Sequence, residues 1–87
     1  MLSAKKMSQA LQHFGINIVR YEESKNPEYI DGEVILWNSL SVQVGRDFAC
    51  LCLVGDEDIE YLLEMEDIYN EIDFATEVAK FLQTKTQ

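Results

Sequence analysis

The only histidine, His13, is the residue type best suited to acid–base catalysis near neutral pH. A hydrolytic triad would need it beside a nucleophile and an orienting carboxylate, and such nucleophiles often stand in motifs such as Gly-x-Ser-x-Gly. The chain contains neither that motif nor an activated-cysteine signature. His13 lies near the end of an amphipathic helical segment, which indicates a surface or capping role. We therefore predict no catalytic residue and do not expect an enzyme.

The two cysteines, Cys50 and Cys52, could supply metal ligands together with His13. A structural zinc site needs four ligands, so this set is too small. Residues two apart on a strand point to the same face, but the geometry for a disulfide between them is poor. Both lie in the most apolar segment, Phe48 to Val54, which indicates core packing. The lack of a disulfide framework favours a reducing compartment, and we expect a cytoplasmic protein.

The segment Asp56-x-Asp58-x-Glu60 has the alternating carboxylates of the first half of a calcium-binding loop. Such a loop needs a glycine at its sixth position and a bidentate glutamate at its twelfth, but here those positions hold Tyr61 and Asp67. The four glycines stand singly at turn positions and form neither a phosphate-binding loop nor a dinucleotide fingerprint. The motifs therefore predict no metal and no cofactor.

The negative charge is concentrated in one part of the chain. The net charge is −9, and no lysine or arginine occurs between Arg46 and Lys80. Binding to nucleic acid or to an anionic membrane needs a basic surface, so neither is expected directly. A basic protein surface, such as that of a nucleic-acid-binding protein, is the complementary partner. The alternative is that the acids only keep a small domain soluble. The base-free stretch contains eleven acids: Asp47, Asp56, Glu57, Asp58, Glu60, Glu64, Glu66, Asp67, Glu71, Asp73 and Glu77.

Aromatic residues in or beside the segment Glu22 to Gly32 add a second candidate feature. This segment contains the only proline and is expected to be a loop, and aromatic residues in such positions often anchor interfaces. The alternative is that they pack over the edge of a sheet. The candidate partner-binding residues are Asp56, Glu57, Asp58, Glu60, Glu64, Glu66, Asp67, Glu71, Tyr29 and Trp37.

The elements that must position these residues follow from hydrophobic periodicity. Helices are expected from Ser3 to about His13, with Gly15 just beyond it, and from about Asp73 to Thr84, with Asp73 as the N-cap. Connections between the strands are short, which requires antiparallel neighbours. Residues 58–66 alternate like a strand but contain good helix formers; we favour the strand. The expected strands are Ile16–Tyr21, Glu33–Trp37, Leu40–Gly45 and Phe48–Val54.

We therefore expect residues 1–87 to form a single acidic α+β domain, an antiparallel β-meander of four or five strands flanked by an N-terminal and a C-terminal helix. No apolar segment is long enough to span a membrane. Two strands, Glu33–Trp37 and Phe48–Val54, are apolar on both faces, which is typical of a sheet covered on both sides. Either the two helices take one face each, or one face meets another protein.

The composition favours a non-enzymatic protein-binding module that presents an acidic face to a basic partner. One concrete form is an inhibitor or immunity-type protein whose carboxylates mimic the phosphates of a nucleic acid. Two alternatives remain open. One is a homo-oligomeric structural or accessory protein such as a homodimer, and the other is a small-molecule-binding domain or small enzyme.

Overall fold

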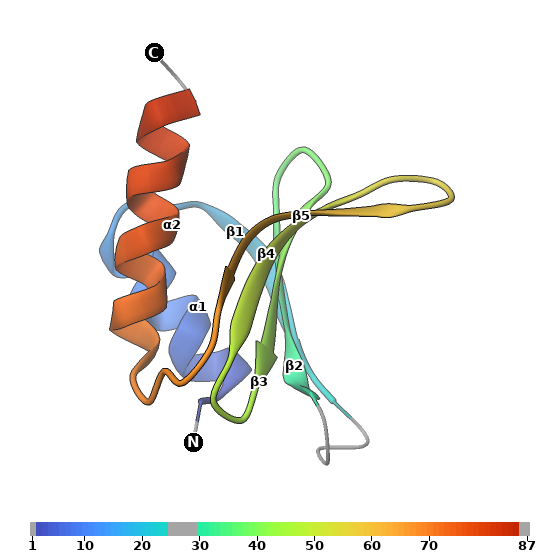
Figure 1. The fold of residues 1–87 in the computed structure, drawn as a ribbon. Helices are drawn as coiled ribbons and strands as arrows, with labels where there is room; N and C mark the ends of the chain where they lie inside the picture. The colour runs from blue at the N-terminus through green and yellow to red at the C-terminus, as the bar shows by residue number, and fades with distance from the viewer. Residues whose placement is uncertain (1, 25–29, 86–87) are drawn as a thin grey trace.

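The computed structural model describes residues 2–24 and 30–85. Its strands form one antiparallel sheet in the order β1-β2-β3-β4-β5, preceded and followed by a helix (Figure 1). The predicted α+β meander is confirmed, and the ambiguous segment 58–66 is a strand. The elements are α1 (Ala4–His13), β1 (Ile18–Glu23), β2 (Ile30–Leu36), β3 (Leu40–Gly45), β4 (Ala49–Val54), β5 (Ile59–Met65) and α2 (Glu71–Lys85).

The start of α1 is capped from two directions. The hydroxyl of Ser3 accepts a hydrogen bond from the backbone N–H of Lys6 at 3.1 Å, as expected for an N-cap serine. The backbone N–H of Ser3 donates to Oε2 of Glu71 at 2.8 Å. The first turn of α1 contains lysines and no acid, so Glu71 supplies the negative charge that favours a helix N-terminus. Because Glu71 is also the first residue of α2, this contact ties the two helices together.

The start of α2 differs from the prediction. The helix begins at Glu71, and its cap is Asn70, whose side-chain oxygen accepts a hydrogen bond from the N–H of Ile72 at 2.9 Å. Asp73, the predicted cap, lies inside the first turn instead, where its charge favours the helix dipole. Asparagine and aspartate are similarly good N-caps, so residue preference did not distinguish the two positions.

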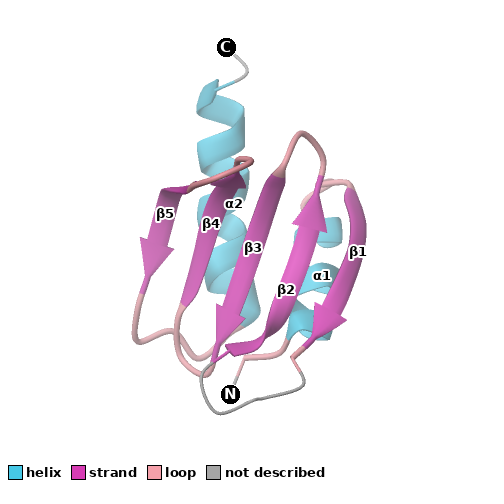
Figure 2. Cartoon of the chain, turned by 90° about the vertical axis from the view of Figure 1, so that its right-hand side faces the viewer, coloured by secondary structure: helices cyan, strands magenta, loops and turns pink. Residues whose placement is uncertain are grey.

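Both helices pack against the same face of the sheet, and Figure 2 shows them together behind the strands. Of the two alternatives for the apolar strands, the one in which each helix takes its own face is therefore wrong. The core lies between the helices and one side of β2, β3 and β4. Its completely buried side chains include Met7, Leu11, Val34, Val42, Leu51, Phe74 and Val78. We call the opposite side of the sheet, which no helix of the described chain covers, the open face.

A β-bulge in β5 changes which side chains reach the open face. Leu51 pairs with Leu63 but the next residue, Cys52, pairs with Tyr61, so Leu62 is an extra residue on β5. Simple alternation placed Tyr61 and Leu63 on the same side. The bulge separates them: Leu63 joins the core, while Tyr61 stands beside Cys52 on the open face.

Candidate interaction surface

The strand register identifies the residues of the open face. One row of paired residues, running from Tyr21 through Val34, Val42 and Leu51 to Leu63, faces the helices, because its three central members are completely buried in the core. The two rows on either side of it point the other way. The first is Arg20, Ile35, Ser41, Cys52 and Tyr61; the second is Glu22, Glu33, Gln43, Cys50 and Glu64.

Apolar side chains gather at the end of the open face that leads to the β4–β5 turn. Val54 pairs with Ile59 on the same side of the sheet as Cys52 and Tyr61. Val54 is 41% exposed, Ile59 44% and Tyr61 53%, and Ile35 in β2 is half-buried. We call Ile35, Val54, Ile59 and Tyr61 the apolar patch. Surface patches of this kind, when polar groups surround them, are typical of protein-binding sites.

Carboxylates surround the other end of the open face. Glu22 and Glu33 are directly opposite on β1 and β2, an arrangement in which two like charges repel. Ser41 donates a hydrogen bond to Oε2 of Glu33 at 2.8 Å, and Nε of Arg20 lies 3.0 Å from Oε1 of Glu22. Glu64 is on β5, three strands from Glu33, a separation of roughly 14 Å. Arg20 is the only base in the two rows.

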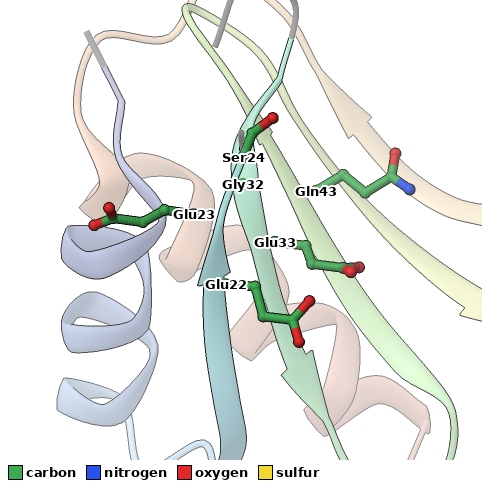
Figure 3. A pocket seen from close by; sticks show the side chains of 6 residues that line it. All are labelled: Glu22, Glu23, Ser24, Gly32, Glu33 and Gln43. Atoms are coloured by element: carbon green, nitrogen blue, oxygen red, sulfur yellow. The ribbon is translucent and has the colours of Figure 1, made fainter. Parts of the chain in front are cut away.

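A shallow depression of about 250 Å³ lies at this acidic end. Figure 3 shows the side chains of Glu22, Glu33 and Gln43 pointing to the same side of the sheet from three neighbouring strands, while Glu23 points to the other side. The depression is open to solvent, and its described side chains form no group that could hold a metal ion. We regard it as part of the open face.

Burial and the nearby carboxylates both raise the pKa values of the two cysteines on this face. Burial, and after it the neighbouring Cys50, Glu33 and Glu64, together raise the pKa of the Cys52 thiol from 9.0 to about 11. The pKa of Cys50 is also raised, first by burial and then by Glu64 and Glu66. Both thiols are free and stay protonated at neutral pH, which makes them poor nucleophiles.

The tip of the β4–β5 hairpin adds three acids beside the apolar patch. Asp56, Glu57 and Asp58 are all exposed, and the turn is closed by a hydrogen bond from the N–H of Gly55 to the carbonyl of Asp58 at 2.8 Å. Figure 1 shows this hairpin projecting beyond the sheet on the side away from the helices. The apolar patch therefore lies between two acidic groups, one at the hairpin tip and one around Glu22 and Glu33.

The remaining predicted partner-binding residues are scattered. Glu60 is exposed but pairs with Leu53, so the bulge directs it to the side opposite Glu64. Glu66 and Asp67 are exposed and follow β5, and Glu66 is near enough to Cys50 to affect its pKa. Glu71 is buried against the start of α1 and is not part of an exposed acidic surface.

Trp37, one of the two aromatic candidates, is not on the open face. Trp37 lies at the β2–β3 turn and lines a depression of about 200 Å³ with Phe14, Ile16, Ala79 and Leu82, at the ends of the two helices. Asn38 and Ser39 both have positive φ, and the N–H of Leu40 donates to the carbonyl of Trp37, so this turn is a tight hairpin. Tyr29 falls outside the described residues.

Several residues of the open face were not predicted as candidate partner-binding residues from the sequence. Glu22 and Glu33 lie before the base-free stretch, and their significance comes from direct pairing across two strands. Alternation within β2 does place Glu33 and Ile35 on one side, which is a usable signal. Tyr61 could not be assigned to this face because the bulge at Leu62 is not visible in the pattern of residues.

Comparison of the chain with known protein families, with curated proteins and with solved structures finds no match in any of the three. Within residues 2–24 and 30–85, no helix is long and apolar enough to cross a membrane. The same part of the chain contains no group of three or more histidine, cysteine or acidic side chains arranged to hold a metal ion.

Proposed function

We propose that this domain is a non-enzymatic protein-binding module whose open face receives a basic protein partner. The observation that carries the proposal is the apolar patch on the uncovered side of the sheet, with carboxylates on both sides of it. The patch offers area for desolvation, and the carboxylates favour a partner rich in lysine and arginine. The free, protonated cysteines on this face accord with a cytoplasmic location.

One specific form of the proposal is an inhibitor that occupies the nucleic-acid site of a basic protein. Glu22, Glu33 and Glu64 are spread along one row of the sheet, and the hairpin tip adds a separate acidic group. In this form the carboxylates stand in for phosphates, and Arg and Lys side chains of the partner contact them. Association would be fast and would weaken with salt.

The first test of the proposal is affinity capture of the partner at low and at high salt, with bound proteins identified by mass spectrometry. The informative variant is Glu64→Lys on the open face, and the matched control is Glu77→Lys, which makes the same charge change on α2. We expect a basic partner that is lost from Glu64→Lys and retained by Glu77→Lys. A partner that both variants retain, or both lose, would show that charge on the open face does not select it.

A further inference from the structure

The sheet has two edges with different charge patterns. β1 pairs only with β2, and β5 pairs only with β4, within the part of the chain that is described. Figure 2 shows β1 and β5 on the two sides of the sheet with no element beyond either. An edge strand has backbone N–H and C=O groups that another strand can pair with, so the side chains decide which partners are accepted.

The β5 edge repels a second copy of itself. It contains Glu60 and Glu64, it is flanked by Asp58 and Glu66, and it has no base. No register of antiparallel β5–β5 pairing can match an acid with a base, because β5 contains no base. Like charges directly opposite each other are unfavourable, and the bulge at Leu62 further disturbs pairing.

The β1 edge has a self-complementary pattern. Antiparallel pairing centred on Tyr21 sets Arg20 of each copy opposite Glu22 of the other. Both side chains point to the open face and are more than half exposed, at 58% and 53%. Within one chain, Arg20 uses Nε to contact Glu22 at 3.0 Å. The guanidinium has further N–H donors, so it can serve the second copy's carboxylate as well.

We propose that the domain forms a homodimer through β1, with two copies of the strand paired antiparallel about Tyr21 and the sheet continuous across both. A twofold axis perpendicular to the sheet keeps both helix layers on one side, so the open faces of the two copies join. Val19 and Tyr21, which are 63% and 40% exposed in one copy, become partly covered at the junction. This inference does not depend on the proposed function.

The junction between the two β1 strands is short, which limits the affinity of the dimer. The register of β1 shifts at Val19, and only Arg20 to Glu23 pair regularly with β2. Three central residues on each copy, Arg20 to Glu22, form the matched segment. Such a junction is expected to be weak, with dissociation in the micromolar to millimolar range, and the charge pairs decide whether it forms.

Two charge-reversal variants separate the charges of Arg20 and Glu22 onto different chains and so test the proposal. Arg20→Glu places acids at both positions 20 and 22, and Glu22→Arg places bases at both, so each variant opposes like charges when it pairs with itself. An equal mixture restores two opposite-charge pairs across the junction. Neither variant has the intrachain Arg20–Glu22 pair, so recovery in the mixture can come only from contact between chains.

Sedimentation analysis of the full chain, from about 10 µM to about 1 mM, measures the result. We expect the unaltered chain to dimerise, each variant to self-associate at least about tenfold more weakly, and the mixture to recover. The matched control is Glu77→Arg on α2, away from both sheet edges, which changes the charge as Glu22→Arg does and should leave self-association intact. A chain that stays monomeric throughout, variants that dimerise as before, or a mixture that does not recover would each overturn the proposal.

Discussion

The two faces of the sheet are built from the same strands but have opposite environments. On β4, Leu51 points into the helix-covered core, and its neighbour Cys52 points to the open face between Ser41 and Tyr61. Both residues are completely buried. Cys52 is covered on a face without a second layer because it is short and its cross-strand neighbour Tyr61 is much longer. An apolar residue on each face of a strand therefore does not by itself require a covering layer on each face.

This comparison predicts that the covered face contributes most of the stability and the open face most of the recognition. The largest effect should come from Leu51→Ala, which leaves a cavity among Val42, Leu63 and the helices. We expect it to lower the free energy of unfolding by about 2–5 kcal/mol. Urea unfolding followed by circular dichroism measures the change. A loss below about 1 kcal/mol would show that this face is not the packed core.

The pH dependence of stability should distinguish Cys52 from the core residues. The pKa of its thiol is 9.0 ordinarily and about 11 in the fold. Between these values the unfolded chain has lost the proton and the folded chain retains it. The stability that the protonated Cys52 thiol contributes is therefore fully present below pH 9. As the pH rises toward 11, the free energy of unfolding falls by about 2 kcal/mol.

The measurement is the free energy of unfolding of the unaltered chain and of Cys52→Ala, at pH about 8 and at pH about 10.5. We expect the unaltered chain to lose more stability than the variant over this interval. Equal losses would mean that the Cys52 thiol does not oppose ionisation in the fold.

The link between Glu71 and Ser3 should have an intermediate effect. Glu71→Ala leaves the N–H of Ser3 without its carboxylate partner and removes the negative charge at the start of α1. We expect a loss of about 1–3 kcal/mol. The matched control is Asp73→Ala in the same turn of α2, which should cost less because its carboxylate is exposed. Equal losses in thermal unfolding would contradict the special role of Glu71.

The smallest stability effects should come from the open face. Glu64→Gln and Tyr61→Ala alter exposed side chains, so each should change the free energy of unfolding by at most about 1 kcal/mol. Both should still weaken partner binding. Large destabilisation in chemical unfolding would mean that these side chains hold the fold together, which would remove the distinction between the two faces.

The sequence predicted the elements better than their arrangement. β3 was predicted with the bounds that the structure has, because Leu40, Val42 and Val44 alternate regularly and turn residues stand on both sides. An apolar stripe on a helix shows that the helix packs on something, but it does not show which face of a sheet it covers. The placement of both helices on one side therefore required the structure.

The candidate site was predicted in part. Asp56, Glu57, Asp58 and Glu64 lie on or beside the open face, and their abundance was visible in the charge pattern. Glu71 was indistinguishable from them in the sequence, because its partner Ser3 is 68 residues away along the chain. The bulge at Leu62 depends on pairing with β4, so the opposite directions of Glu60 and Glu64 could not be derived from alternation.

The most direct test of the open face as the binding site is the affinity of the captured partner for Tyr61→Ala compared with Tyr69→Ala. The two variants make the same chemical change on exposed tyrosines, one in the apolar patch and one in the connection to α2. We expect Tyr61→Ala to weaken binding by about tenfold or more and Tyr69→Ala to leave it nearly unchanged. If Tyr69→Ala weakens binding and Tyr61→Ala does not, the partner binds elsewhere and the open face is only a solvated surface.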